Sequence, residues 1–319
     1  MNTKVVYVLV SNKNDYYVEM LQLSLYSLRI FHPDDIVEVV MDEKTYSRLV
    51  KQKHRLLADV KPIVVKIPKE YSLMQRSRYL KTRLREIIVG DFFYLDTDTV
   101  IADSLAAIDD FQWDMAAVLD NHDGKISDAQ IKSEPDNWVS LYPGRQFNCG
   151  VLFVKDTPDS RRFFKLWHEN WKFSVSNGCS FDQPAHRKTI GDTRSPIHEL
   201  SGQWNCQVNL ATSIENQKDA IIFHYKRAGF YVSKICREIR QKGKILDLAA
   251  ALAENPRQYF CGQTYYITKM EYSSMVSLRK TQYDYPGMYS FLVNMAGMYR
   301  SIVTRLSIQK HKIVALIKR

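Results

Sequence analysis

Short apolar runs alternate with longer amphipathic segments at the start of this chain. The pattern predicts strands near 4–10, 36–40 and 62–67, with helices near 16–31 and 43–55 between them. Alternating strands and helices build α/β folds with a largely parallel sheet, because each helix returns the chain to the edge where the previous strand began. We therefore expect an α/β fold with a mixed, mainly parallel sheet that binds its ligand at the carboxyl ends of the strands.

Two acids stand directly after another apolar run. Phe92–Leu95 has the aromatic and branched side chains of a buried strand, and Asp96 and Asp98 follow it. Strand side chains two residues apart point the same way, so both carboxylates, with Thr97 between them, can converge on one hard divalent cation. Asp-X-Asp triplets arise easily by chance. A binding site is favoured over a solvated turn because the apolar pattern resumes at 100–101.

A basic segment at 76–85 precedes this strand and is predicted to be helical. Arg78 and Lys81 lie three residues apart and therefore share a helix face. They are the best candidates in the segment for contact with a phosphate, whereas the other charges are typical of a solvated face.

Two later apolar runs and a capped helix continue the pattern. The segments "WDMAAVLD" and "FNCGVLFV" predict strands on either side of a stretch, 120–146, that is rich in Asp, Asn, Pro and Gly. That stretch is either a binding loop or a long surface connection. Thr157 and Pro158 predict the cap and the first residue of a further helix.

Several of these features form one ordered series: an arginine-bearing helix, "YLDTDTVIADSL", "FNCGVLFV", "FDQPA", "WN" and "IIFHY". In that order they resemble the GT-A glycosyltransferases, in particular the family 8-like enzymes, over residues 1–230. The resemblance implies a Rossmann-like nucleotide-diphospho-sugar transferase domain. It also implies metal-dependent transfer of a hexose from a UDP-sugar to a saccharide or lipid-linked acceptor, with retention of configuration.

A metal site follows from the same resemblance. Asp96, Asp98 and His224 would hold Mn²⁺ or Mg²⁺, and a histidine ligand favours Mn²⁺ because imidazole suits transition metals. His198, in "SPIHEL", is the competing histidine, and a histidine after an apolar run is also typical of a hydrogen-bonded strand end.

The resemblance also assigns the catalytic and donor-binding residues. Asp182 would bind donor sugar hydroxyls, and Gln183 would lie near the anomeric carbon, where a neutral amide stabilises an oxocarbenium-like centre. The implied donor-binding residues are Val10, Ser11, Tyr17, Arg78, Lys81, Asp96, Thr97, Asp98, Asn148 and Lys226. Lys226 departs from the family pattern, since "YKRAG" follows the histidine without Pro-Trp.

Asp120, Trp204 and Asn205 are the predicted contacts to the sugar or the acceptor, and 120–146 would then be an acceptor-side loop. Local spacing alone leaves other interpretations open. Asp182 also fits a helix N-cap, Asn148 a turn residue and Trp204 a core residue.

The excess basic charge lies at the C-terminal end of the chain. Residues 1–230 carry 30 Lys and Arg against 30 Asp and Glu, whereas residues 231–319 carry 15 against 5. We therefore expect a GT-A domain over 1–230 and a C-terminal helical basic segment over 231–319. Its part 286–319 has a basic amphipathic pattern, which fits either an anionic membrane surface or packing on the core or a partner subunit.

The composition favours a reducing compartment. The five Cys are odd in number and include no C-x-x-C pair, which indicates free thiols rather than a disulfide framework or a zinc site. The apolar start is too short for a signal peptide, and no apolar run approaches the roughly 20 residues of a membrane span. We expect a protein that is either free in the cytoplasm or peripheral on the inner membrane face, and that binds a nucleotide sugar and its acceptor but no nucleic acid. The sequence leaves its oligomeric state open.

Two other function classes fit part of the pattern. "FFYLDTDTV" also matches the Asp-X-Asp-X-Thr motif of haloacid-dehalogenase-like phosphatases, whose first Asp is a nucleophile. That strand usually comes first in their catalytic core, whereas here it follows the strands predicted above. The third hypothesis is a non-catalytic protein that binds a sugar nucleotide or a membrane, and the acids at 96, 98 and 182 argue against it.

Overall fold

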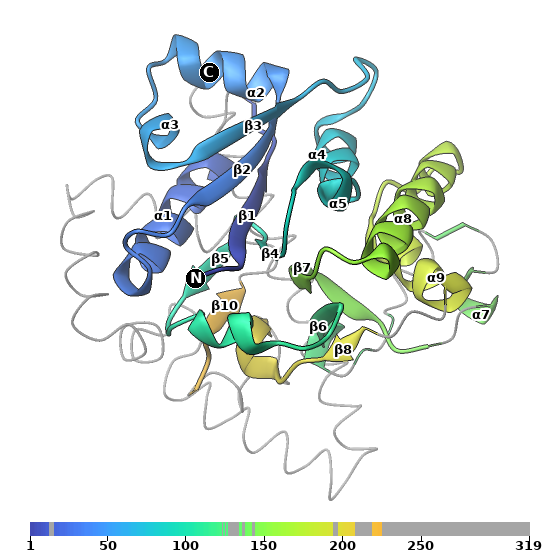
Figure 1. Ribbon diagram of the computed structural model, residues 1–319. Coiled ribbons are helices and arrows are strands. Elements are labelled where there is room, and N and C mark those ends of the chain that lie inside the picture. The colour runs from blue at the N-terminus through green and yellow to red at the C-terminus, as the bar shows by residue number, and fades with distance from the viewer. Residues whose placement is uncertain are drawn as a thin grey trace, which may run out of the picture. The chain divides into compact units, whose positions relative to one another are not determined.

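The structure is a computed structural model that describes residues 1–12, 16–122, 124, 126, 134–135, 138–141, 144–193, 197–207 and 219–224. Within these residues the framework is a seven-stranded sheet with helices on both faces, together with a three-stranded sheet (Figure 1). The large sheet contains β1 (Lys4–Leu9), β2 (Val37–Asp42), β3 (Lys61–Val65), β4 (Phe92–Leu95), β6 (Met115–Leu119), β7 (Phe147–Val154) and β8 (His198–Glu199). The small sheet contains β5 (Thr99–Ile101), β9 (Cys206–Gln207) and β10 (Ile222–His224).

The helices connect these strands. They are α1 (Tyr16–Phe31), α2 (Glu43–Lys51), α3 (Leu56–Asp59), α4 (Leu73–Lys81), α5 (Leu84–Ile87), α7 (Trp138–Leu141), α8 (Pro158–Ser176) and α9 (Gln183–Thr193). Short 3-10 helices are η1 (Ala106–Asp110), η2 (Asp120–His122) and η3 (Gly202–Asn205).

The large sheet is mixed and mainly parallel, as predicted. Its order is β3-β2-β1-β4-β7-β6-β8. The strands from β3 to β4 are parallel, β7 is antiparallel to both β4 and β6, and β8 is parallel to β6. In the small sheet β10 lies between β5 and β9.

Both faces of the large sheet are covered, which is typical of parallel strands joined by helices. Tyr7 and Leu9 of β1 belong to a core cluster with α1, α2 and α3, whereas Val6 and Val8 belong to a second cluster with α4, α5, α8 and α9. Alternate side chains of one strand therefore support opposite helix layers.

The topology fixes where a ligand can bind. β1 lies between β2 and β4, so the chain leaves β1 toward one side of the sheet and later returns to its other side. In open α/β sheets the crevice at the carboxyl ends of such a strand pair is where ligands bind. Ser11 follows β1 and Asp96 follows β4 at this edge. Because β6 is antiparallel to β7, as β4 is, Asp120 after β6 also lies there.

Capping side chains begin two of these helices, and the cap of α8 is the one that the sequence predicts. Thr157 caps α8 with a reciprocal bond to Ser160, and Pro158 is the first residue. Asp42 caps α2 through the backbone N–H of Thr45 at 3.2 Å.

Two predicted helices are interrupted. The helix predicted over 43–55 ends at Lys51, because Lys53 takes a left-handed conformation with φ of 47°, and α3 follows separately. The basic segment 76–85 is divided between α4 and α5. Within the stretch 120–146, the described residues include η2 and α7.

Residues 225–319 lie outside the described part of the chain. They include Lys226, the boundary predicted near 230 and the basic segment with its part 286–319, so these predictions are untested. Among the residues that the structure does describe, no helix is long and apolar enough to cross a membrane.

Candidate active site

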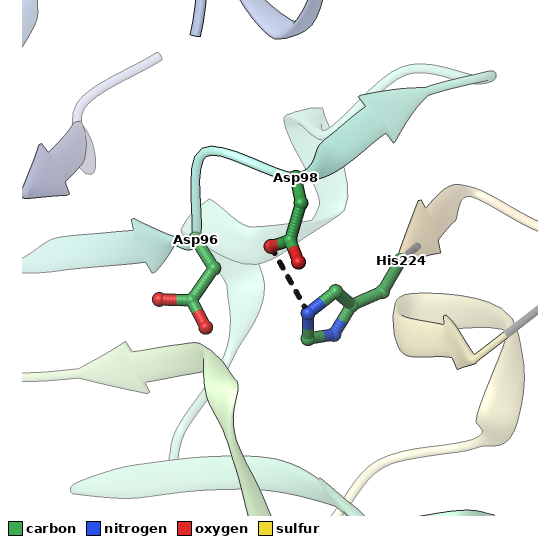
Figure 2. A group of neighbouring side chains, drawn as sticks. All are labelled: Asp96, Asp98 and His224. Carbon is green, nitrogen blue, oxygen red and sulfur yellow. Dashed lines mark ion pairs between the residues drawn. The ribbon is translucent and has the colours of Figure 1, made fainter. Parts of the chain in front are cut away.

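The structure brings Asp96, Asp98 and His224 together (Figure 2). The two acids lie between β4 and β5, and His224 ends β10, whose antiparallel pairing places it opposite Thr99 of β5. One ligand atom from each of the three lies within 4.8 Å of the others, and His224 Nε2 is 3.3 Å from Asp98 Oδ1. Two carboxylates and an imidazole therefore converge at one point, as predicted.

A series of hydroxyl groups anchors the turn that carries both acids. Thr99 Oγ1 donates to the backbone oxygen of Asp96 at 2.8 Å and lies 3.2 Å from Ser24 Oγ of α1. Ser24 Oγ lies 2.8 Å from the Tyr7 hydroxyl of β1. Burial raises the pKa of Tyr7, so its phenol stays protonated. The turn is thus fastened to both α1 and β1.

Asp96 makes two further contacts. The Tyr94 hydroxyl donates to Asp96 Oδ1, and Lys81 Nζ lies 3.4 Å from the same oxygen. Burial would raise the pKa of Asp96, but nearby positive groups, with Lys81 the strongest and Arg78 also contributing, lower this pKa on balance. The carboxylate is therefore ionised at neutral pH, which a metal ligand requires.

Asp182 is the centre of a second set of charges. Its Oδ1 lies 3.2 Å from Arg78 Nε and its Oδ2 lies 3.0 Å from Lys81 Nζ. Burial would raise the pKa of Asp182, but the two cations hold that pKa well below its usual range. Arg78 keeps 28% of its side chain exposed and Lys81 only 3%, so Arg78 is the cation that can reach a ligand.

The pKa of each cation reflects this pairing. Asp182 raises the pKa of Arg78 despite burial. Burial would lower the pKa of Lys81, but Asp182 and Asp96 outweigh it and raise this pKa. Arg78 and Lys81 meet Asp182 from one face of α4, as their spacing predicts. The carboxylate of Asp182 thus contacts both Arg78 and Lys81. An N-cap residue would need neither contact.

Gln183 is the first residue of α9 and lies beside this charged cluster. Its Nε2 atom is buried and has no hydrogen-bond partner among the described residues. A buried amide nitrogen without a partner is costly, so this atom is suited to a bound ligand. His186, one turn later, is neutral because burial lowers its pKa to about 3.

Gly150 of β7 has no side chain, and the side chains of His224 and Asp96 occupy the space beside it. A Cβ atom at this position would lie 2.3 Å from His224 Cε1, 2.8 Å from Asp96 Oδ2 and 3.0 Å from Asn148 Oδ1. The backbone oxygen of Gly150 also accepts from the Asp96 N–H at 2.7 Å. No side chain fits here while the three residues keep their places.

We expect Gly150→Ala to lower Mn²⁺ affinity roughly 10–100-fold, the range seen when ligands are wrongly oriented. The added methyl group displaces His224 or Asp96, while the fold survives an overpacking cost of about 1–3 kcal/mol. Gly144→Ala is the control, since no atom of the described residues lies within 4 Å of a Cβ there. Calorimetric Mn²⁺ titration of both variants checks this. Equal affinities for the two variants would contradict the close approach.

Buried amide groups link His224 to the acid after β6. Asn205 Oδ1 lies 2.9 Å from His224 Nδ1, and Asn205 Nδ2 donates to Asn148 Oδ1 at 2.9 Å. Asn148 Nδ2 donates to Asp120 Oδ1 at 3.0 Å, and Gln146 Nε2 donates to Asp120 Oδ2 at 2.9 Å. The predicted sugar and acceptor contacts Asp120, Asn148 and Asn205 are thus hydrogen-bonded to one another.

The hydrogen bonds of these buried side chains extend to α9 through Arg187. Arg187 NH1 donates to Gln146 Oε1 at 3.1 Å and to Glu134 Oε1 at 3.0 Å. The side chains of Arg187 and Glu134 are almost fully buried. The helix that begins with Gln183 is therefore tied to the stretch 120–146.

Three residues predicted near the nucleotide base lie at or near the end of β1. Val10 and Ser11 are buried, and Tyr17 is 40% exposed in the first turn of α1. The Ser11 N–H donates to Thr45 Oγ1 at 3.0 Å, and Arg48 NH2 donates to Ser11 Oγ at 2.7 Å. The polar end of β1 is thus held by α2, at the same sheet edge as Asp96.

Three other predicted residues take clear positions. Trp204 lies in the core, with ring centroids 6.0 Å from Phe93 and 5.2 Å from Phe111, so it packs the core rather than lining an acceptor site. His198 stacks on Trp113 at 3.4 Å and is not part of the cluster. Thr97 is nearly buried in the turn between the two acids.

Sequence reasoning missed Tyr94, Gly150 and Gln146. Tyr94 had a usable signal, because a residue two before Asp96 on a strand shares its side. Gly150 lies inside an apolar strand run, which signals a close backbone approach but not its partner. Gln146 has no local signal, since its role depends on the pairing of β6 with β7.

No protein-family model and no curated protein matches the sequence. Among solved structures, the chain is similar to apo mouse xyloside xylosyltransferase 1, with TM-score 0.46 and 13% identity over 70% of this chain and 98% of that chain. It is also similar to the apo form of the glycosyltransferase GlyE of Streptococcus pneumoniae TIGR4, with TM-score 0.47 and 15% identity over 76% of this chain and 64% of that chain. A second GlyE structure gives TM-score 0.46 and 14% identity. The chain spans less than two thirds of GlyE.

Proposed function

We propose that the protein is a metal-dependent glycosyltransferase that uses a nucleoside-diphosphate sugar. The observation that carries this proposal is the convergence of Asp96, Asp98 and His224 at the carboxyl edge of β4, beside Arg78 and Asp182. A nucleoside diphosphate, a divalent cation and a polar sugar each find matching chemistry there. The motif order of the sequence makes UDP-sugars the first donors to test.

The three residues fit a divalent metal. Two carboxylate oxygens and an imidazole nitrogen are a ligand set that suits Mn²⁺ and also admits Mg²⁺. His224 Nδ1 lies against the Asn205 side-chain oxygen, which leaves Nε2 directed at Asp98. A bound metal would neutralise charge on the departing diphosphate. The exposed face of Arg78 would add a second positive group for the phosphates.

Transfer breaks the bond between the anomeric carbon and a diphosphate oxygen. A new bond forms to an acceptor hydroxyl oxygen, whose proton passes to the diphosphate. Asp182 would accept hydrogen bonds from sugar hydroxyls, since its lowered pKa keeps it ionised. Its two cations make it a poor base, because they stabilise the carboxylate.

Gln183 would act at the reacting carbon. Its amide nitrogen has no partner among the described residues, and Gln183 is adjacent to Asp182 in the sequence, so a sugar held by Asp182 would come near it. A neutral amide is a weak nucleophile but stabilises positive charge through its carbonyl oxygen. We propose retention of configuration on the basis of the sequence resemblance, with a saccharide or lipid-linked acceptor.

Incubation with a panel of nucleotide sugars and Mn²⁺ should release a nucleoside diphosphate from one of them, measured by mass spectrometry. Gln183→Ala should lower turnover while leaving donor affinity within a few-fold, because a group that acts in the transition state affects rate more than binding. The overturning result would be a phosphoaspartate trapped at Asp96 with a phosphorylated substrate, since the phosphatase hypothesis requires that intermediate.

A further inference from the structure

We infer that Asn205 and Asn148 form a buried series of hydrogen bonds that holds a proton of His224 on Nδ1, so that Nε2 is the ring atom that faces Asp96 and Asp98. This makes Asn205 and Asn148 positioning residues for the cluster, beyond the sugar and acceptor contacts predicted from sequence. The inference rests on the proposed metal site for its purpose. Its evidence is the direction of each hydrogen bond.

The direction begins at a group that can only donate. The backbone N–H of Gly150 lies 2.8 Å from one side-chain atom of Asn148, so that atom is the oxygen. The same oxygen faces Asn205 at 2.9 Å, and the Asn205 atom that meets it must be the nitrogen. Asn205 therefore turns its oxygen toward His224.

The last link decides the tautomer. Asn205 Oδ1 lies 2.9 Å from His224 Nδ1 and can only accept, so Nδ1 carries the proton. In a neutral ring Nε2 is then unprotonated, and this is the atom 3.3 Å from Asp98 Oδ1. The arrangement suits a bound cation, because ligand lone pairs must point inward.

Burial prevents this series of hydrogen bonds from reversing. Asn205 is 0% exposed, and Asn148 and His224 are each 3% exposed. Turning either amide would place two acceptors, or two donors, in contact without water to replace the lost bonds. At the far end Asn148 Nδ2 donates to Asp120 Oδ1, and Asp120 Oδ2 accepts from Gln146. Asp120 therefore supports the same direction.

The test is nitrogen–hydrogen correlation NMR on metal-free, ¹⁵N-histidine-labelled full-length protein at pH 8, with His224 assigned through a His224→Gln variant. We expect wild type to carry the proton on Nδ1. Asn205→Leu should lose that preference and lower Mn²⁺ affinity roughly 10–100-fold in calorimetry. Asn205→Asp keeps an acceptor for Nδ1 and should retain the Nδ1–H tautomer, which a merely structural role of the amide would not predict.

Asn170→Leu is the matched control, because Asn170 is a buried amide that bonds Thr189 and Asp192 between α8 and α9. It should change neither the tautomer nor Mn²⁺ affinity. A wild-type spectrum with no proton on Nδ1 overturns the inference whether or not the variants fold. Wild type that shows the Nδ1–H tautomer but binds no Mn²⁺ would instead overturn the metal role in the proposed function.

Discussion

Asp98→Asn is expected to abolish metal-dependent donor binding while leaving the fold intact. Asp98 is the best residue for this test, because its carboxylate is 21% exposed and its contact in the cluster is with His224. Asp96 is less suitable, since it also accepts from Tyr94 and pairs with Lys81. Calorimetric titration with a nucleotide sugar should show that Mn²⁺ no longer raises affinity. The loss should exceed the roughly 10–100-fold effect of an outer-shell residue.

Asp110→Asn supplies a control of equal charge change at an exposed acid of η1. It should leave both donor affinity and its dependence on Mn²⁺ unchanged. Asp98→Asn with wild-type affinity and wild-type metal dependence would remove the metal from the proposed function. A variant that binds Mn²⁺ weakly but still releases nucleotide at the wild-type rate would remove the metal from the reaction only.

The regular elements could be predicted because each leaves a local apolar pattern. α1 and β7 lie at the residues that the pattern indicates, since an amphipathic helix repeats apolar side chains at a fixed period and a buried strand is a short, nearly continuous apolar run. The break after α2 could not be predicted. Lys53 adopts a left-handed conformation there, and neither Gly nor Pro marks it in the sequence.

In the candidate site, too, some residues could be predicted from local patterns and others could not. Asp96 and Asp98 could be found from their spacing after a strand, because period-two alternation is local. His224 reaches them only through the pairing of β10 with β5, which no local period reveals, so motif order was the useful signal. A buried amide such as Asn205 carries no sequence mark that tells a ligand contact from a bond to another side chain.

Lys81→Met is expected to destabilise the protein by about 3–5 kcal/mol, the cost of leaving a buried charge without its partner. Met keeps most of the apolar stem of Lys81 but removes the cation that lies 3.0 Å from Asp182 and 3.4 Å from Asp96. Asp182 would then retain Arg78 alone. The free energy of unfolding in urea at pH 7 measures the effect.

Burial, not distance, should decide the size of this effect. Arg145 and Glu199 form a closer pair at 2.9 Å, but their side chains are 60% and 48% exposed, so Arg145→Met should change stability by less than about 1 kcal/mol. The double variant Lys81→Met/Asp182→Asn should be more stable than Lys81→Met, because it removes one of the two carboxylates whose charge Lys81 no longer balances. If Lys81→Met costs no more than Arg145→Met, Lys81 does not hold the charges of the site together. If the double variant is less stable than Lys81→Met, Asp182 stabilises the fold through contacts that do not depend on its charge.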